Sequence, residues 1–236
     1  MRPMSGSRRA TGEERGRVGG PRPLLADRGF GRRGAGLRWT VLTLLGTLIL
    51  RLMGFRLAGR FPRERKVVVI GAPHTSNWDF LPAIGCKWAL ALPTCYLIKH
   101  TLVRGPLGWL LRATGAIPVD RSQPGGVIEQ LVRTFETREQ LVLAIAPEGT
   151  RSWRPVWKSG FYRIAQAAGV PIVCCAFDYR HRRLVFSEPI EPTGKPRADM
   201  DRIRAFYRGV EGRRPEKAGP VRLRIESENH GGEAQR

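Results

Sequence analysis

Lys66-Val-Val-Val-Ile-Gly-Ala72 carries the clearest structural signal in the chain, and Pro73 and His74 follow it directly. Its four consecutive β-branched residues are apolar on both faces of a strand, which is typical of a central strand covered on each side. Other short apolar runs alternate with helical patterns along the chain. The sequence therefore predicts an α/β fold with a mixed central sheet covered by helices.

The alternation extends on both sides of this strand. Strands are expected at 66–72, 95–99, 116–119, 141–146, 170–177 and 184–186, and helices at 80–90, 107–114, 127–138, 160–168 and 200–210. Residues 60–226 are thus expected to form a single catalytic-sized domain, which suits a chain of 236 residues. Residues 1–36 and 227–236 are polar, lack apolar periodicity and are predicted to be disordered tails.

The segment at 37–57 combines apolar and basic residues. The net charge of the chain is +21, and residues 1–66 hold sixteen Lys or Arg against four acidic residues. The longest apolar run, 39–50, is interrupted by Arg51 before it reaches the roughly 20 residues of a full span. The sequence predicts an N-terminal apolar helix associated with a membrane surface, with a tilted span as the alternative.

The four cysteines indicate a reducing compartment. Cys86, Cys95, Cys174 and Cys175 form no CxxC pair and have no histidine at zinc spacing. Reduced, buried thiols are the natural interpretation, and no metal site is expected. We therefore expect the protein on the cytoplasmic face of a membrane.

A histidine and an aspartate follow the first long strand in the stretch His74-Thr-Ser-Asn-Trp-Asp79. On one continuous helix, positions five apart point about 140° away from each other, so the pair can meet only across a bend. The strand end and the helix start after it supply that bend. A carboxylate against one imidazole nitrogen fixes the tautomer and leaves the other nitrogen to accept a proton. The alternative is a histidine that merely completes a turn.

Three further loops follow predicted strands or introduce one. Glu148-Gly-Thr-Arg151 combines a flexible glycine with an arginine suited to phosphate oxygens. Glu148 is a candidate to fix the Arg151 guanidinium or to accept a hydrogen bond from a ligand hydroxyl. The alternative is a solvated turn with a surface ion pair. The stretch 115–122 ends in Arg121-Ser122, a second possible phosphate ligand at the same sheet edge. The stretch 169–173 begins with a glycine and leads into a buried strand. A structural role is sufficient to explain it.

In their order along the chain, these four sequence motifs resemble those of the lysophosphatidic acid acyltransferase family, also called the glycerophosphate acyltransferase superfamily. The resemblance covers about residues 66–179, and a His-x4-Asp followed by Glu-Gly-Thr-Arg is a specific combination. Two positions depart from it, Pro118 and the pair Val173-Cys174, and both lie where acceptor shape could be read.

The resemblance implies an O-acyltransferase that uses no metal, no cofactor and no acyl-enzyme. It implies that His74 is the general base, that Asp79 orients it, and that an acyl-CoA or acyl-carrier-protein thioester is the co-substrate. The residues implied in binding the acceptor are Lys99, Arg121, Glu148, Gly149, Thr150 and Arg151.

The expected reaction moves a fatty acyl group to the hydroxyl of a lysophospholipid, with 1-acylglycerol-3-phosphate as the first choice. Another lysolipid or an amino-acid lipid is the nearer alternative. A nucleic-acid-binding protein would explain the sequence pI of about 11.4. It would not explain the order of the motifs or the apolar run, so no nucleic-acid partner is expected.

Overall fold

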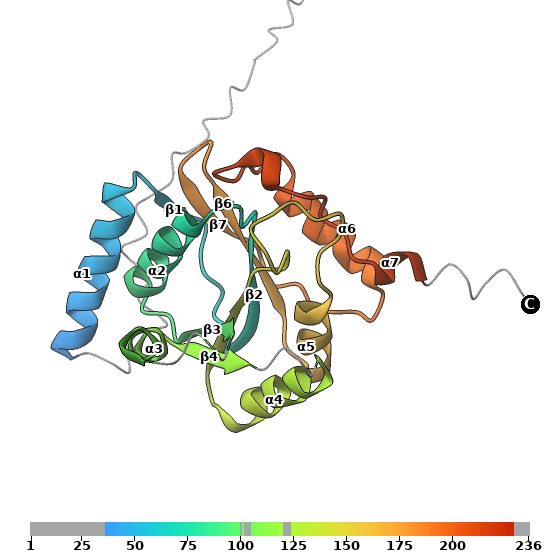
Figure 1. Cartoon of the computed structure of the whole chain (residues 1–236), viewed down its shortest axis with the longest axis horizontal. Helices are drawn as coiled ribbons and strands as arrows, with labels where there is room; N and C mark the ends of the chain where they lie inside the picture. Colours follow the sequence, from blue (N-terminus) through green and yellow to red (C-terminus); the bar gives the residue numbers. More distant parts are fainter. Residues whose placement is uncertain (1–35, 100, 102–104, 120–123, 229–236) are drawn as a thin grey trace, which may run out of the picture.

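A seven-stranded sheet forms the centre of the protein in the computed structural model, which describes residues 36–99, 101, 105–119 and 124–228 (Figure 1). The strand order is β1-β7-β6-β2-β5-β3-β4. The strands are β1 Arg56–Ala58, β2 Lys66–Ala72, β3 Thr94–Lys99, β4 Ala116–Val119, β5 Leu141–Ile145, β6 Ile172–Asp178 and β7 Arg183–Phe186. The predicted mixed sheet is confirmed, because β6 and β7 pair antiparallel whereas all other neighbours are parallel.

The parallel register brings several strand ends to one edge of the sheet. β2 lies between β5 and β6, with Val69 opposite Ala144 on one side and Val173 on the other. β3 and β4 continue the sheet beyond β5 in the same direction. The loops that follow β2, β3, β4, β5 and β6 therefore all leave from the same edge.

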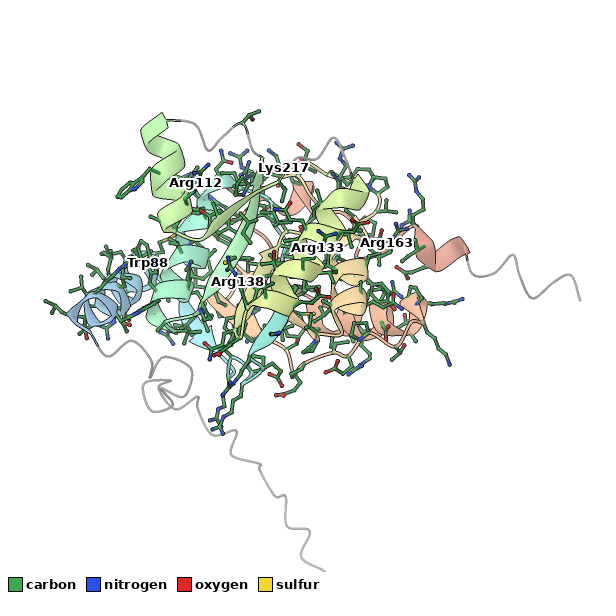
Figure 2. The ribbon with its side chains drawn as sticks, turned by 90° about the horizontal axis from the view of Figure 1, so that it is seen from below. Trp88, Arg112, Arg133, Arg138, Arg163 and Lys217 are labelled. Atoms are coloured by element: carbon green, nitrogen blue, oxygen red, sulfur yellow. The ribbon has the colours of Figure 1, made fainter. Side chains whose placement is uncertain are left out.

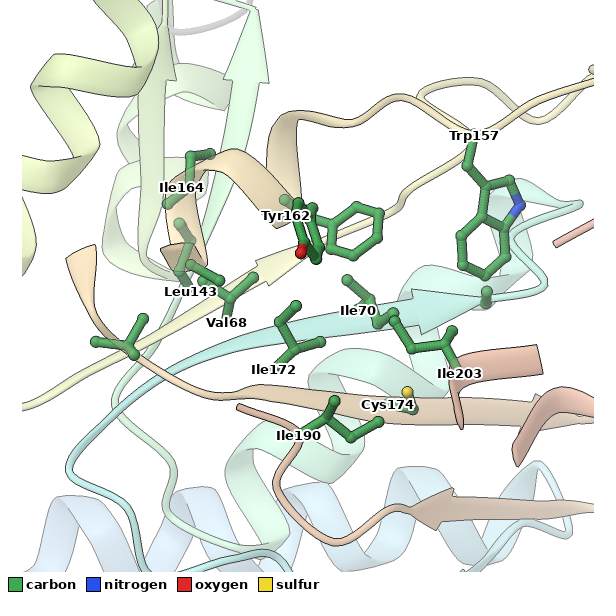
Figure 3. Close-up of a cluster of buried hydrophobic side chains, with 14 of the residues drawn as sticks. Val68, Ile70, Leu143, Trp157, Tyr162, Ile164, Ile172, Cys174, Ile190 and Ile203 are labelled. Atoms are coloured by element: carbon green, nitrogen blue, oxygen red, sulfur yellow. The ribbon is translucent and has the colours of Figure 1, made fainter. Parts of the chain in front are cut away.

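Alternate residues of the central strands face two different helical layers. Val68 and Ile70 point into the larger core, where they meet side chains of α4, α5 and α6 (Figure 3). Val67 and Val69 point into the smaller core, which includes residues of α1 and α2. The helices are α1 Leu37–Leu52, α2 Phe80–Ala89, α3 Gly105–Ala113, α4 Pro124–Thr137, α5 Gly160–Ala168, α6 Pro196–Tyr207 and α7 Ile225–Glu228.

Helix α1 packs directly against α2. A Cβ built on Gly46 would lie only 2.5 Å from the backbone nitrogen of Ala89 and 2.7 Å from Cβ of Trp88, so the two helices approach at a residue without a side chain. Trp88 lies on the side of α2 that faces α1 (Figure 2). Within the described part of the chain, none of the helices has both the length and the apolar character required to cross a membrane.

The apolar segment proposed at 37–57 divides into two elements. Helix α1 ends at Leu52, and Arg56–Ala58 pairs with β7 as the short edge strand β1, which the sequence analysis did not predict. Phe55, between them, is buried in the smaller core. The sheet thus begins before residue 60, the expected start of the domain. The sequence did not reveal this strand, because three residues are too few to show a periodicity that distinguishes them from the apolar run.

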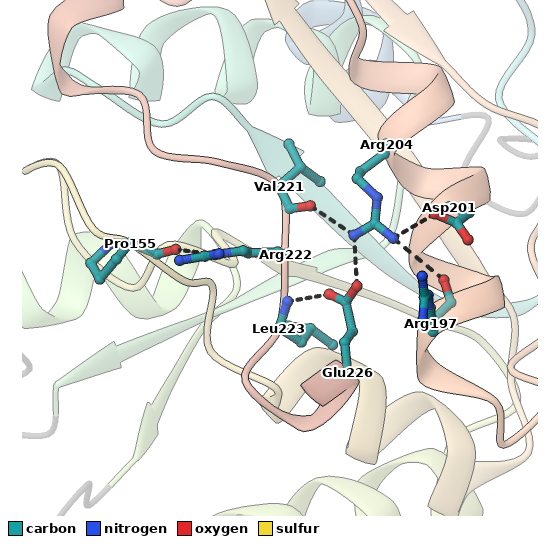
Figure 4. A network of polar contacts seen from close by, with 8 residues as sticks. All are labelled: Pro155, Arg197, Asp201, Arg204, Val221, Arg222, Leu223 and Glu226. Carbon is teal, nitrogen blue, oxygen red and sulfur yellow. Dashed lines mark hydrogen bonds and ion pairs between the residues drawn. The ribbon is translucent and has the colours of Figure 1, made fainter. Parts of the chain in front are cut away.

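The last described residues are fixed to α6. The guanidinium of Arg204 binds Glu226 at 2.7 Å and Asp201 at 2.6 Å, and it also donates to the carbonyl of Val221 (Figure 4). Ser227 and Glu228, which the sequence analysis placed in the C-terminal tail, are the final residues of α7. The proposed tail 1–36 lies outside the described residues except for Gly36.

Candidate active site

The loop after β2 folds around the carboxylate of Asp79. The backbone N–H groups of Thr75 and Ser76 both donate to Asp79 Oδ2 at 2.9 Å. Ser76 in turn caps the short 3-10 turn Asn77–Asp79, accepting a hydrogen bond from Trp78 N. This reciprocal capping box satisfies backbone donors that the turn leaves free, and α2 starts immediately after it. The bend expected between residues 74 and 79 is therefore present.

His74 and Asp79 are in direct contact across this bend. His74 Nδ1 lies 3.1 Å from Asp79 Oδ2, and the aspartate side chain is fully buried whereas that of His74 is 21% exposed. A proton on Nδ1 then points at the carboxylate, which leaves Nε2 as the basic nitrogen. His74 Nε2 forms no hydrogen bond with a described residue. The pair therefore has the geometry of an oriented general base that can accept a proton from a hydroxyl.

Hydrogen bonds keep Asp79 ionised despite its burial. Burial by itself would raise the pKa of Asp79, but hydrogen bonds from His74, Tyr179 and the Ser76 backbone outweigh it, and the pKa is lowered below its ordinary value of 3.8. The carboxylate is thus negative at neutral pH and stabilises a positive charge on the imidazole.

Glu148 reaches the same loop from the neighbouring strand. It follows β5, which pairs with β2, and its Oε1 accepts a hydrogen bond from the backbone N–H of His74 at 2.8 Å. Its other oxygen, Oε2, is buried and has no hydrogen-bond partner among the described residues. Burial raises the pKa of Glu148, although the His74 backbone bond opposes this. The sequence analysis offered Arg151 as the partner of Glu148, but the structure gives it the His74 backbone instead.

The rest of the Glu148 loop is open to ligand. Gly149 has a φ of +66°, a conformation that favours glycine, and the flexible side chain of Lys158 lies close to it. The hydroxyl of Thr150 accepts a hydrogen bond from Ser152 N at 3.3 Å. Arg151 is exposed and pairs with no described residue, so its guanidinium is free to bind an anion.

Of the two remaining residues predicted to bind the acceptor, Lys99 lies further along the same edge. Lys99 is the last residue of β3, opposite Val119 at the end of β4. Its strand is two places from β2, or about 10 Å in sheet spacing. Arg121 lies outside the described residues. The structure thus brings His74, Asp79 and Glu148 into contact and places Lys99 at the same edge.

Three residues of this site were missed by the sequence analysis. The hydroxyl of Tyr179 donates to Asp79 Oδ1 at 2.7 Å, and the backbone N–H of Arg214 donates to the hydroxyl of Thr75 at 3.1 Å. Gly212 packs on the His74 loop so closely that a Cβ would lie 2.8 Å from Thr75 Oγ1. Tyr179 had one available signal, because it lies two residues after the end of the predicted buried strand at 170–177. The other two carry no recognisable motif.

Comparisons with known proteins agree with this fold. A family model described as Acyltransferase matches residues 55–178, just over half of the chain. A similar solved structure is the crystal structure of the 1-acyl-sn-glycerophosphate (LPA) acyltransferase PlsC from Thermotoga maritima. It is 17% identical, with a TM-score of 0.54, and the match covers 79% of this chain and 83% of the other. A comparison with curated protein sequences finds no match.

The α/β fold and the family match define the protein as an acyltransferase. More particularly, the chain belongs to the acyltransferase family, and the resemblance inferred from its motifs is confirmed. The family match ends at Asp178, so Tyr179 and the loop of Gly212 and Arg214 lie beyond it.

Proposed function

We propose that this enzyme transfers a fatty acyl group from a thioester donor to the free hydroxyl of a lysophospholipid, with 1-acylglycerol-3-phosphate as the acceptor, in phospholipid biosynthesis. The observation that carries the proposal is the contact between His74 and Asp79, 3.1 Å long, at the sheet edge where Glu148 and Lys99 also lie. The similarity to the acyltransferase from Thermotoga maritima supports the same acceptor class.

In the proposed reaction, the acceptor oxygen attacks the thioester carbonyl while its proton passes to His74 Nε2. Asp79 stabilises the imidazolium that forms. The tetrahedral intermediate then collapses, the carbon–sulfur bond breaks, and the departing thiolate takes the proton from His74. The enzyme returns to its starting state without a covalent acyl intermediate, and the proposed reaction needs neither a metal nor a cofactor.

The acceptor's phosphate is proposed to bind on the β5, β3 and β4 side of His74. Arg151 is exposed in the loop after β5, Lys99 is the last residue of β3, and Arg121 follows β4 in the sequence. Long basic side chains from these positions would hold the phosphate and so place the hydroxyl against Nε2. Such positioning converts a chance encounter into an aligned reaction. The unpartnered Oε2 of Glu148 is available to accept a hydrogen bond from the glycerol part of the acceptor.

Helix α1 is proposed to lie on the membrane surface, on its cytoplasmic face. Its exposed apolar residues are Leu37, Val41, Leu44, Leu45, Leu48 and Leu52. At about 100° per residue they fall within one arc about 100° wide, opposite the Gly46 face that packs on α2. The apolar stripe fits the acyl region of a lipid surface, where both the acceptor and the product reside.

The decisive experiment measures transfer of radiolabelled acyl groups from acyl-CoA and from acyl-carrier protein to a panel of lysolipids, for wild type and for His74→Ala. Loss of a general base is expected to lower turnover by roughly 10²–10⁴-fold. His181→Gln is the matched control, because His181 Nδ1 also contacts a buried aspartate, Asp178, at 2.8 Å but lies on the β6–β7 turn. It is expected to keep wild-type turnover at saturating donor.

The outcomes separate reaction from substrate. Acylation of 1-acylglycerol-3-phosphate that is lost in His74→Ala supports the whole proposal. Acylation of a different lysolipid only, again lost in the variant, keeps the reaction and changes the acceptor. Equal activity in wild type and His74→Ala contradicts the role of His74.

A further inference from the structure

A hollow of about 420 Å³ opens beside the end of β6, outside the four sequence motifs. Three of its lining residues are the arginines Arg180, Arg182 and Arg213, and a single carboxylate, Glu211, lies among them. The cavity, called the arginine hollow below, is therefore cationic. It is formed by the β6–β7 turn and by the loop after α6, which lie next to each other because Tyr179 N donates to the carbonyl of Glu211 at 2.9 Å.

Contacts with neighbouring side chains hold the guanidinium groups of Arg213 and Arg180 in place and leave N–H donors available to a ligand. Arg213 lies over the rings of Trp78 and Tyr179, at 5.4 and 6.0 Å from their centroids. Arg180 Nη1 is paired with Glu211 at 2.9 Å, where the Arg180 side chain is largely exposed and that of Glu211 is partly exposed. Each guanidinium has five N–H donors in a planar fork that suits phosphate oxygens. An arginine stacked on aromatic rings keeps these donors along its edge, where an anion can reach them.

Two successive contacts connect the arginine hollow to the proposed base. Tyr179 lines the hollow with its ring and donates its hydroxyl to Asp79, which contacts His74. Gly212 also lines the hollow, and its backbone packs against Thr75 in the His74 loop. An anion bound in the hollow would therefore be connected to the His74 loop through Tyr179 and Gly212.

Strand order places this hollow opposite the proposed acceptor site. In the order β6-β2-β5-β3-β4, Glu148 and Lys99 are on one side of β2, and Tyr179 is on the other. Two substrates must meet at His74, and the acceptor's phosphate is already assigned to the β5 side. The second cationic site then fits the phosphates of the second substrate, the thioester donor.

We propose that the arginine hollow binds the phosphates of a coenzyme A thioester, namely its adenosine 3′-phosphate and diphosphate groups, while the flexible pantetheine arm carries the acyl group to His74. This inference rests on the proposed function, since it concerns the donor of the same reaction. The shared chemistry is phosphate recognition by arginine, and the other available source of phosphate is an anionic lipid headgroup. The experiments below distinguish the two.

Binding to the full-length enzyme is measured first by calorimetry, with CoA, dephospho-CoA and pantetheine as probes. Arg180→Gln and Arg213→Gln are each expected to weaken CoA binding about tenfold or more, the size of one lost charge-assisted hydrogen bond. Pantetheine, which lacks these phosphates, is expected to bind equally to wild type and variants. Arg163→Gln is the control, because Arg163 is an exposed arginine on α5 (Figure 2). Thermal unfolding confirms that each variant is folded. If Arg213→Gln is unstable, Arg180→Gln still provides the test, because Arg180 is exposed and its replacement should not disturb folding.

Kinetics provide the second readout. The KM for a long-chain acyl-CoA is expected to rise about tenfold in Arg180→Gln and Arg213→Gln, while the KM for the corresponding acyl-pantetheine stays unchanged. Equal losses with both donors, or unchanged CoA binding in both variants, would overturn the proposal. Weaker binding to phosphatidylglycerol vesicles with unchanged CoA binding would assign the hollow to a lipid headgroup. Loss confined to acyl-carrier protein would assign it to that protein.

The binding series needs no turnover. A wild-type enzyme that acylates no lysolipid would contradict the proposed function. The calorimetric comparison of CoA binding to wild type and the arginine variants would still test the arginine hollow independently.

Discussion

The hydroxyl of Tyr179 donates a 2.7 Å hydrogen bond to Oδ1 of Asp79, a residue one hundred positions earlier in the chain. Asp79 Oδ2 is meanwhile occupied by His74 and two backbone N–H groups, so Tyr179 satisfies the remaining oxygen of a buried carboxylate. Burial and the adjacent Asp79 raise the pKa of Tyr179 above its ordinary value, and the hydroxyl therefore stays a donor. The orientation of His74 thus depends on strand β6 as well as on its own loop.

Tyr179→Phe is expected to destabilise the protein at neutral pH by about 1–3 kcal/mol, because a hydrogen bond to a charged, buried acceptor is lost. The bond lowers the pKa of Asp79, so its stabilisation is complete above 3.8 and is lost as the pH falls through the lower folded value. Urea unfolding of both proteins should therefore show a difference that shrinks in acid. A difference that is independent of pH would contradict this account. Turnover should fall less than in His74→Ala. The acid limb of the pH profile of turnover should move to higher pH, because Asp79 is protonated at a higher pH without this hydrogen bond.

Glu148→Gln tests the buried carboxylate beside His74. Glutamine keeps an oxygen that can accept from the His74 N–H but removes a charge that burial disfavours. Because burial raises the pKa of Glu148, its ionisation costs stability as the pH rises above 4.5. The variant is expected to be more stable than wild type at neutral pH, with the gain vanishing below 4.5. Its KM for the acceptor should rise if Oε2 binds the glycerol part. Chemical denaturation across this pH range and acceptor titration check the two statements separately.

Gly212→Ala tests the contact between the loop after α6 and the His74 loop. The new Cβ would lie 2.8 Å from Thr75 Oγ1 and 3.2 Å from Pro73 Cβ, so one of the loops must move. Overpacking of this kind costs about 1–3 kcal/mol. We expect lower thermal stability and lower turnover together. Gly160→Ala is the control, since a Cβ there meets nothing within 4 Å, and it should change neither property for the worse.

Leu44→Asp tests the lipid-facing stripe of α1. Burying one leucine contributes about 1.5–3 kcal/mol, so the variant is expected to bind phosphatidylglycerol vesicles at least about tenfold more weakly. Gln130→Asp, on the exposed face of α4, adds the same negative charge and should leave vesicle binding almost unchanged. Co-sedimentation measures both. Equal binding by Leu44→Asp and wild type would remove α1 from the membrane contact.

Local sequence signals accounted for most of the fold and part of the site. Strand 66–72 was predicted with its observed limits, because an apolar run bounded by charge and proline is a local property. Strand β1 was not, because Arg56–Ala58 becomes a strand only by pairing with β7, more than 120 residues later. His74 and Asp79 were paired from spacing, since the bend between them is also local. Tyr179 and Gly212 reach Asp79 and Thr75 only through the order of the strands, which no single segment encodes.

The dependence of the His74 loop on the far end of the chain also governs when the enzyme can become competent during its synthesis. Tyr207 donates its hydroxyl to the carbonyl of Ile70, and Arg214 donates its backbone N–H to Thr75, 137 and 139 positions away. A nascent chain that has left the ribosome only as far as Asp178 holds His74 and Asp79 but lacks the residues that brace their loop. Premature termination between residues 174 and 213 would therefore leave a polypeptide that has every sequence motif but lacks part of the contacts that hold the His74 loop.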